Sequence, residues 1–412
     1  MTALLFNPRD PQFNADPYRH YRRLREEDPI HRSPLGVWFL GRYEDVRHVL
    51  RDSHFAVKDI PAQIARKSDI LQRTRVSANQ PADLAALHRN SRWWLSFIEP
   101  PDHTRIRRLV HKAFHQRTVE ALRQAARGCA QSLIDDIRSR GSMDLIADFA
   151  RVLPSRMIAA LLGVPPQDLP LLVRLTEQIS RILDPLMSLE EYGLLDRASH
   201  DFSAYLQRLI DARREHPRED LITALIQAQE ERDALSDDEM ISTCILLFAA
   251  GSETTVNLIG NGMLALLRDP ERMQELAGNP ALAPQAVEEL LRYDAPLQMT
   301  SRVALEDVPF GEKIIRRGEQ VYAVVGSANR DPRVFANPDE LSFQRERNHH
   351  LAFAAGHHLC LGAALARIEG QEAIGALVER LPDLQIACTE VQWRAHIVLR
   401  GLARLPVRFA AH

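Results

Sequence analysis

Cys360 lies in a glycine-interrupted loop, Phe353 to Gly362, directly before an apolar, alanine-rich segment that predicts a helix from Leu361 to Val378. A thiolate there faces the first unpaired N–H groups of the helix, and the helix dipole favours its negative charge. Gly356 lets the backbone turn tightly, and Gly362 lets a large flat group lie close to the chain. These features suit a thiolate that binds a metal inside a planar macrocycle. Taken alone, a single cysteine is more often a small buried hydrophobe.

A second polar group interrupts a long apolar helix. Ser236 to Glu239 form a capping box, and the pattern that follows predicts a helix as far as Asp269. Roughly thirty residues at 1.5 Å each span about 45 Å. Gly251, Glu253 and Thr254 break the helical preference at its centre. One interpretation is a tolerated glycine with the glutamate turned to solvent; the other is a helix opened at one turn to admit oxygen, water and a proton path.

Basic residues recur on a third element, the predicted helix that begins near Asp102 after Pro100-Pro101. His103 and Arg107 are four residues apart and share one face, as do Arg108 and Lys112. Basic residues on a helix usually form a solvated face. A buried carboxylate, however, needs charge-assisted donors of this kind.

Together these segments resemble the cytochrome P450 family over nearly the entire chain. Phe-x-x-Gly-x-His-x-Cys-x-Gly resembles its haem-binding loop, 250–254 its oxygen-activation motif, and Glu289-x-x-Arg292 a structural ion pair. The family usually has glycine where this chain has Ala354. The resemblance implies a mainly α fold with smaller β-sheets, formed by residues 1–412 as one large helix-rich domain. It places haem b between the long central helix and the helix after the cysteine loop.

The family's functional roles transfer residue by residue. Cys360 would be the proximal iron ligand, while Glu253 and Thr254 would deliver protons during catalysis. His103, Arg107, Arg302 and His358 match positions that hold the haem propionates. The resemblance further assigns Ala250, Gly251, Phe353, Gly356 and Gly362 to haem binding, and Trp93, Trp94, Leu246, Leu247, Leu297, Gln298 and Ile397 to the substrate pocket. For the two tryptophans, anchoring of the core is the alternative.

Composition narrows the class of protein. The chain has 412 residues, 45% hydrophobic and 26% charged, with a net charge of −3, so it has no overall attraction to nucleic acid or an anionic membrane. Its 4 cysteines are widely spaced, which does not fit a disulfide framework. The apolar run from Ile241 to Ala250 is about half as long as a membrane span. A soluble, cytoplasmic protein is expected.

Other segments predict the surrounding elements. Helices are expected at Asp16–Asp28 and Tyr43–Asp52, a strand at Val37–Leu40, and closing strands at Val391–Trp393 and from Leu399 onward. By contrast, the stretch from about 56 to 97 is irregular and polar, which predicts a long connection of the kind that is usually functional or mobile.

The expected function is a haem-thiolate monooxygenase that inserts one oxygen atom from O2 into a largely apolar small molecule, by hydroxylation or epoxidation, in secondary metabolism. Electrons would come from a ferredoxin or flavodoxin and its reductase, docked near Arg108, Lys112 and Arg367. Alternatives are a P450-fold peroxygenase or isomerase and a non-catalytic haem sensor, both disfavoured by the Glu253–Thr254 pair. A weaker alternative is a zinc hydrolase built on Cys360 and its neighbouring histidines.

Overall fold

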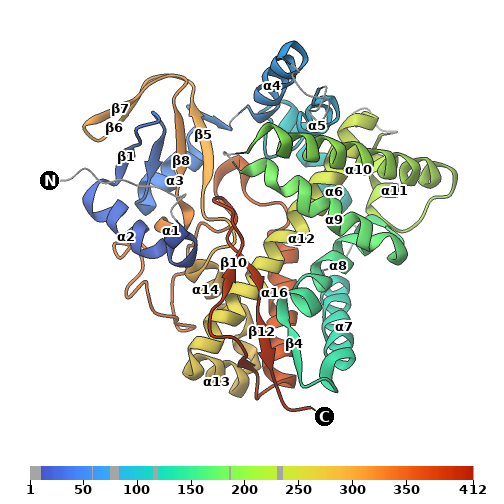
Figure 1. The fold of residues 1–412 in the computed structure, drawn as a ribbon, viewed down its shortest axis with the longest axis vertical. Helices are drawn as coiled ribbons and strands as arrows, with labels where there is room; N and C mark the ends of the chain where they lie inside the picture. Colours follow the sequence, from blue (N-terminus) through green and yellow to red (C-terminus); the bar gives the residue numbers. More distant parts are fainter. Residues whose placement is uncertain are drawn as a thin grey trace. The chain divides into compact units, whose positions relative to one another are not determined.

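The computed structural model of the protein describes residues 11–57, 59–74, 83–114, 119–184, 187–229 and 235–411. The chain forms two compact units. Unit 1 comprises Met1–Ala56, Val119–Pro154 and Thr254–His412, and unit 2 comprises Val57–Thr118 and Ser155–Glu253. Helices predominate, with small sheets (Figure 1). The predicted class, mainly α with smaller β-sheets, is confirmed, while the assignment of residues 1–412 to one domain stays a prediction.

A five-stranded sheet is the largest sheet of unit 1. Its order is β1-β2-β8-β5-β3, with β2 and β8 parallel. The strand predicted at Val37–Leu40 is β2, whose three residues are all buried, as is typical of a strand covered on both faces. Smaller sheets have the orders β4-β12-β9, β6-β7 and β10-β11. The strands are β1 (Ile30–Arg32), β2 (Trp38–Leu40), β3 (Phe55–Val57), β4 (Ser142–Asp144), β5 (Thr300–Ala304), β6 (Val308–Phe310), β7 (Lys313–Ile315), β8 (Gln320–Ala323), β9 (Gln385–Ile386), β10 (Gln392–Trp393), β11 (Leu402–Arg404) and β12 (Pro406–Arg408).

Helices of unit 1 pack around α16, which follows the cysteine loop and contacts α7 and α14. Its Ala373, Ile374 and Leu377 recur at helical spacing and are buried. The predicted helices that became α2, α3 and α16 are confirmed to within about two residues. The helical elements are α1 (Pro11–Ala15), α2 (Pro17–Glu27), α3 (Tyr43–Arg51), α7 (Val119–Arg138), the π-helix η1 (Leu145–Ala150), α13 (Pro270–Gly278), η4 (Pro280–Leu282), α14 (Ala283–Tyr293), α15 (Val325–Ala328), η5 (Gly356–His358) and α16 (Ala363–Arg380).

Unit 2 is helical throughout its described residues, apart from its connections. Its longest helix of its own, α10, contacts α5, α9 and α11, and Figure 1 shows α5 close to α10. The elements are α4 (Ile60–Thr74), α5 (Ala85–Ser91), α6 (Asp102–Phe114), most of α8 (Val152–Leu162), η2 (Pro166–Asp168), α9 (Leu169–Ile179), η3 (Ser180–Leu183), α10 (Leu189–Glu215) and α11 (Leu221–Gln229).

The prediction of an irregular stretch from 56 to 97 is wrong, because α4 and α5 form there. Ile64 and Leu71, two turns apart on α4, are both buried. On α5, the Asn90 side-chain amide donates to the Ser199 carbonyl of α10 at 2.9 Å. Tertiary contacts therefore stabilise helices that local sequence preference does not indicate. Residues 75–82 of the same stretch lie outside the described residues.

The long helix α12 (Asp237–Arg268) contributes its first half to unit 2 and its second half to unit 1. The predicted capping box is confirmed, since the Ser236 N–H donates to Glu239 at 2.8 Å and the Glu239 N–H donates to Ser236 Oγ at 3.3 Å. The predicted opening at one turn is not seen, because every residue of α12 is α-helical. The Ser252 hydroxyl donates to the Phe248 carbonyl one turn back at 2.8 Å, which satisfies this polar side chain inside an intact helix.

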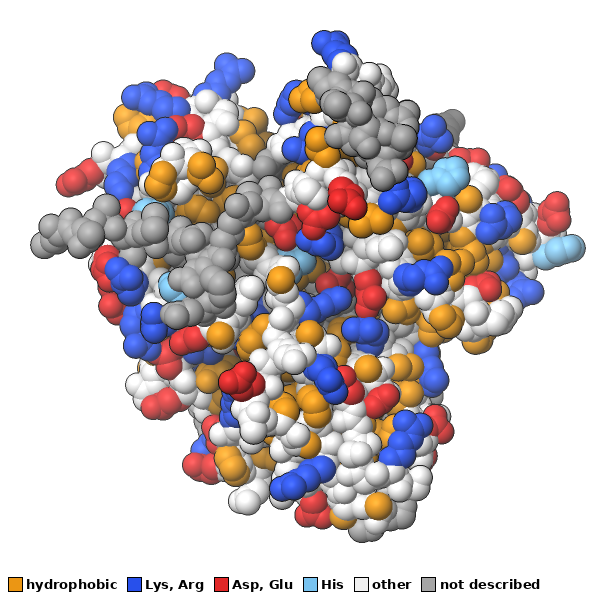
Figure 2. Space-filling view, in the orientation of Figure 1, with side chains coloured by type: hydrophobic (Ala, Val, Ile, Leu, Met, Phe, Trp, Pro, Cys, Tyr) orange, Lys and Arg blue, Asp and Glu red, His pale blue; other side chains and the backbone are white. Residues whose placement is uncertain are grey.

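Among the described residues, α12 alone is long and apolar enough to cross a membrane. However, 78% of its most apolar window is buried inside the protein, as in the core helix of a globular fold. On the face drawn in Figure 2, basic and acidic side chains are interspersed. This agrees with the net charge of −3 and differs from the single-sign patch typical of nucleic-acid binding.

Candidate functional site

Backbone hydrogen bonds close the loop that carries Cys360 in unit 1. The Cys360 N–H donates to the Phe353 carbonyl at 2.9 Å, and the Leu359 N–H donates to the Gly356 carbonyl at 3.1 Å. Cys360 is exposed, and Leu359 beside it is 47% exposed. A cysteine that packs as a small hydrophobe is normally among the most buried residues. The alternative of a core cysteine is therefore wrong for Cys360.

Three positions of this loop differ in what they require of the backbone. Gly356 has a φ of +74°, and a Cβ there would lie 2.5 Å from the Leu50 carbonyl oxygen, so both conformation and packing demand glycine. Ala354 has a φ of +60°, a region that costs an L-residue about 1–2 kcal/mol. A Cβ on Gly362 would meet no protein atom within 4 Å. Close packing of protein atoms therefore does not explain why residue 362 is glycine. The missing side chain leaves open space next to the loop.

Glu288 of α14 braces the loop, although no sequence pattern indicates a role for it. Its carboxylate accepts two hydrogen bonds from Arg367 of α16, at 2.6 and 2.9 Å, and lies 3.2 Å from His350 Nε2. The Arg367 guanidinium in turn lies 4.5 Å above the centroid of the Phe353 ring. These partners are 62 and 79 residues from Glu288 in the chain, so no local spacing could have indicated the network.

The hydrogen bonds of this network lower the pKa of Glu288 and raise the pKa of Arg367. Burial alone would raise the pKa of the Glu288 carboxyl, but the hydrogen bonds from His350 and Arg367 lower it to about 2. The hydrogen bond to Glu288 raises the pKa of Arg367, and the charge of Cys360 contributes in the same direction. Arg367 was expected to lie where a redox partner docks. It is paired with Glu288 and keeps 38% of its side chain exposed, so docking near it stays a prediction.

The predicted Glu289–Arg292 pair lies in the interior of unit 1. Arg292 donates to both carboxylate oxygens of Glu289 at 2.8 Å, and the two side chains are 1% and 0% exposed. Arg292 also donates to three backbone carbonyls, those of Asn329, Pro338 and Glu340. The pair thus fixes the irregular segment that leads into the cysteine loop, and its charges are fully hydrogen-bonded as burial requires.

Arg302 occupies β5 in unit 1 and is 4% exposed. Its Nη1 donates to Thr300 Oγ1 at 3.2 Å and to the Ser301 carbonyl at 2.9 Å. His358 is half-buried, with its ring centroid 4.2 Å from that of the exposed His357. A haem needs a thiolate for its iron, room for its flat ring and cationic donors for its carboxylates. Unit 1 offers the exposed thiol of Cys360, the open space over Gly362 and the buried guanidinium of Arg302. The residues present in unit 1 therefore fit the cofactor.

The middle of α12 keeps one face that protein does not fully cover. Phe248 and Ala249, which point elsewhere, are 0% and 6% exposed. Residues at the spacing i, i+4, i+8 share a helix face. The partly or fully exposed residues are Leu246, Leu247, Ala250, Gly251 and Thr254. All five were predicted to contact cofactor, substrate or protons. Glu253, by contrast, is only 8% exposed, so the interpretation that turns it to solvent is wrong.

Helix α6 of unit 2 carries the predicted basic residues. His103 is 2% exposed and Arg107, one turn later, is half-buried, while Arg108 and Lys112 are exposed. The inner and outer faces expected from the four-residue spacing are therefore present. Asp102 begins the helix, and its carboxylate lies 3.2 Å from Arg105.

The residues assigned to the substrate pocket fall into two groups. In unit 2, Trp94 is 3% exposed and stacks on Phe97 with ring centroids 5.4 Å apart, the arrangement of a core anchor. Trp93 is half-buried beneath the Arg92 guanidinium. In unit 1, Leu297 and Ile397 are half-buried.

Gln298 of unit 1, also assigned to the pocket, is 2% exposed. Its amide donates to the Ala295 carbonyl at 2.7 Å and to the Tyr18 hydroxyl at 3.3 Å. Through these contacts Gln298 holds the Ala295 backbone and the Tyr18 side chain in place.

Comparisons of sequence and of structure with known proteins identify the same family. The family model "Cytochrome P450" matches residues 29–279 and 281–382. The polyketide biosynthesis cytochrome P450 PksS of Bacillus subtilis (strain 168) is 37% identical over 421 aligned positions, covering 99% of both chains. The mycinamicin IV hydroxylase/epoxidase of Micromonospora griseorubida is 38% identical and covers 94% of both chains. The crystal structure of P450BioI in complex with hexadec-9Z-enoic acid ligated acyl carrier protein has a TM-score of 0.88 at 37% identity, covering 97% of this chain and 100% of that chain.

Proposed function

Because the chain belongs to the cytochrome P450 family, we propose that this haem-dependent monooxygenase hydroxylates or epoxidises a largely apolar small molecule of bacterial secondary metabolism. The observation that carries the proposal is the exposed Cys360 in a braced, glycine-dependent loop. Relatives named for polyketide biosynthesis and for mycinamicin oxidation support the metabolic context. A separate ferredoxin or flavodoxin with its reductase would supply the electrons, and the protein would act in the cytoplasm.

Each site residue has a definite task in this proposal. Bound haem supplies the activation of dioxygen. The Cys360 thiolate would hold the iron, and the half-buried or buried donors His103, Arg107, Arg302 and His358 would neutralise the two propionate carboxylates. Charge-assisted bonds are the strong ones in a site shielded from water, so these donors also orient the cofactor.

Proton delivery is assigned to α12. The Glu253 carboxyl is mostly buried and Thr254 follows it on the partly uncovered face. The carboxyl would pass protons from outside the site, and the Thr254 hydroxyl would hold a proton where oxygen is reduced. A positioned acid of this kind contributes on the order of 10²–10⁴ in rate. Leu246, Leu247 and Ala250 offer apolar surface to the substrate.

The decisive experiment compares wild-type protein with Cys360→Ser in the dithionite-reduced, carbon monoxide-treated state. We expect wild type to give the long-wavelength Soret band of a thiolate-ligated haem and the serine variant to lose it. An unchanged band in the variant would exclude Cys360 as the ligand, and a wild-type band at the shorter, histidine-like wavelength would exclude a thiolate.

A carrier-bound substrate is the second candidate. It is favoured by the similarity to P450BioI, which was solved with an acyl-loaded carrier protein. Titration with free hexadec-9Z-enoic acid and with the same acid on an acyl carrier protein, followed by the spin-state shift of the haem, separates the two. Tighter binding of the carrier form by tenfold or about 1.4 kcal/mol would favour it. Equal binding would favour a free small molecule.

A further inference from the structure

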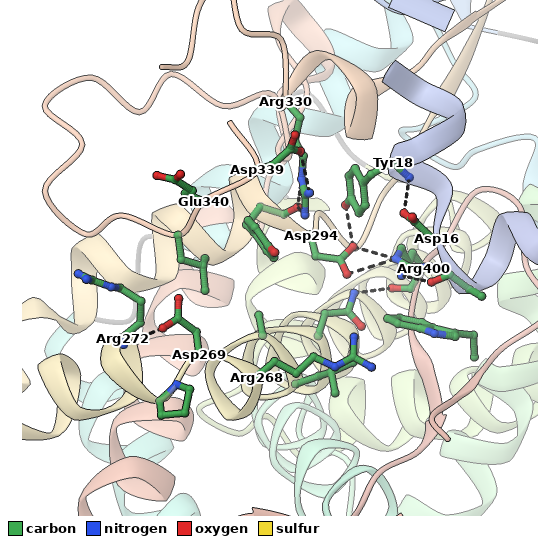
Figure 3. Close-up of a pocket in the computed structure, with 18 of the residues that line it drawn as sticks. Asp16, Tyr18, Arg268, Asp269, Arg272, Asp294, Arg330, Asp339, Glu340 and Arg400 are labelled. Carbon is green, nitrogen blue, oxygen red and sulfur yellow. Dashed lines mark hydrogen bonds and ion pairs between the residues drawn. The ribbon is translucent and has the colours of Figure 1, made fainter. Parts of the chain in front are cut away.

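A solvent-open cavity of about 890 Å³ lies in unit 1 and contains none of the residues predicted to do chemistry. Figure 3 shows its charged lining. Most of those charges are already paired: Arg400 lies 2.9 Å from Asp294, Arg330 lies 3.1 Å from Asp339, and the Tyr18 hydroxyl donates to Asp294 at 2.7 Å. The cavity is therefore a wet, internally neutralised space beside the second half of α12.

Asn261 of α12 forms part of the inner wall of this cavity. Its side chain is 1% exposed. The amide nitrogen donates to the Arg400 carbonyl at 3.0 Å, which fixes the orientation of the amide, since the flipped form would place two oxygens together. Its Oδ1 is buried and has no hydrogen-bond partner among the described residues.

Asn257 lies one turn earlier and is also 1% exposed. Neither its Oδ1 nor its Nδ2 has a partner in the described part of the chain. Gly401 covers it so closely that a Cβ there would collide with the amide oxygen. Buried amides without partners are costly and uncommon, and each requires an explanation. Three such atoms on adjacent turns of one helix require a shared explanation.

Helical geometry connects these amides to the predicted proton relay. At about 100° per residue, Thr254, Asn257 and Asn261 fall within a sector of about 60° on α12. Thr254 and Asn261 are about 10 Å apart along the axis at 1.5 Å per residue. Thr254 is half-buried on the uncovered face, and Asn261 borders the cavity. These three residues form a stripe on α12 that runs from the solvent-open cavity to the Thr254 hydroxyl, beneath the segment 399–401.

We propose that Asn257 and Asn261 are positioning residues for a file of bound waters that carries protons from the cavity to Thr254. This inference rests on the proposed role of Thr254. Buried waters bind otherwise unsatisfied polar groups, with about three hydrogen bonds each. An amide suits the task because its oxygen accepts and its nitrogen donates without titrating. Each water receives a proton on the cavity side and releases one toward Thr254, so one solvent proton moves and no electron does.

The test replaces each amide by a side chain of the same shape, in Asn257→Leu and Asn261→Leu. A matched control is Ser242→Ala, because Ser242 lies on another sector of α12, is 0% exposed, and its hydroxyl has no partner among the described residues. Asn257→Leu and Ser242→Ala remove side-chain groups that have no hydrogen-bond partner among the described residues, so stability to urea should stay equal or rise in these two holoproteins. Asn261→Leu also removes the hydrogen bond to the Arg400 carbonyl, so its stability should fall.

Proton supply should separate the asparagine variants from the control. With hexadec-9Z-enoic acid as the probe and a surrogate ferredoxin system, we expect product per NADH to fall roughly tenfold in the leucine variants, and the H2O/D2O rate ratio to rise. Ser242→Ala should match wild type. Asn261→Ser, which keeps a hydroxyl and leaves room for water, should recover most of the coupling.

A readout without turnover is the water structure itself. A high-resolution crystal structure of the holoprotein should show ordered waters bonded to Asn257 and to Asn261 Oδ1, and Asn261→Leu should lose those at its position. Absence of ordered waters along Asn257 and Asn261, unchanged coupling in the leucine variants, or loss of stability together with coupling in Asn257→Leu would each overturn the proposal. Tight coupling in Thr254→Ala would instead overturn the proposed role of Thr254.

Discussion

At the scale of single residues, Ala354 is the position where this chain departs from the family pattern and accepts strain. Its φ of +60° is unfavourable for alanine, so Ala354→Gly should raise the free energy of unfolding by about 1 kcal/mol. Urea denaturation of the holoprotein, followed by circular dichroism, measures this. The neighbouring Ala355 has an extended φ of −153°, so Ala355→Gly should be destabilising. An Ala354→Gly protein that is no more stable than wild type would contradict the strain.

Thr254 gives the second prediction at this scale. Thr254→Ala should keep haem and substrate binding but release reducing equivalents as hydrogen peroxide, because the proton held at the hydroxyl is missing. We expect peroxide per NADH to rise toward one and product per NADH to fall on the order of 10²-fold. Thr254→Ser should restore coupling. A tightly coupled alanine variant would show that another group holds the proton.

Residue types in the sequence predicted which groups do the chemistry of the site better than they predicted which residues hold those groups in place. Cys360 and the glycines around it could be identified from one loop, because thiolate, turn and helix are adjacent in sequence. Glu288 could not be identified, because its partners His350 and Arg367 are far away in the chain and only the fold brings them together. Asn257 and Asn261 were missed for another reason: asparagine in a helix looks merely unfavourable until its burial is known.

At the scale of elements, the brace between α14, α16 and the cysteine loop depends on the ionised Glu288. Its folded pKa of about 2 lies below the ordinary value of 4.5. A depressed carboxyl pKa stabilises the protein above the ordinary value, and that contribution is lost as pH falls through 4.5 toward 2. Between pH 7 and pH 4, wild type should therefore lose roughly 1 kcal/mol more stability than Glu288→Gln.

Denaturant midpoints of both proteins at the two pH values measure this difference. Glu312→Gln is the matched control, because Glu312 is exposed and far from the loop in sequence. The control should follow the acid dependence of wild type. If Glu288→Gln loses as much stability as wild type between pH 7 and pH 4, the carboxylate does not stabilise the brace.

Elements with strong periodicity or caps were predictable, whereas those fixed by tertiary contacts were not. The capping box at Ser236 located the start of α12, because two side-chain bonds there are local. Helix α5 was missed, since its stability comes from hydrogen bonds and packing against α10, more than a hundred residues away. The expected opening of α12 was wrong because Ser252 bonds within the helix instead of interrupting it.

At the scale of the whole molecule, we expect electron supply by the proposed redox partner to depend on charges that face outward. Arg108 and Lys112 are exposed on α6, so Arg108→Glu with Lys112→Glu should slow ferredoxin-dependent NADH oxidation by roughly tenfold at low ionic strength. The difference should shrink as salt screens the charges. Reversal of the exposed Arg19 on α2 is the control. An equal effect of both reversals would indicate non-specific charge repulsion.

Cooperativity of unfolding tests whether residues 1–412 behave as one domain. Neither compact unit is a continuous segment, and α12 contributes to both without interruption. Unfolding of either unit alone would therefore break this helix at its centre, where the predicted cofactor and proton contacts lie. We expect a single transition in the holoprotein, with loss of helical circular dichroism and loss of the Soret band at the same temperature. Two separate transitions would instead show that the units are independent domains.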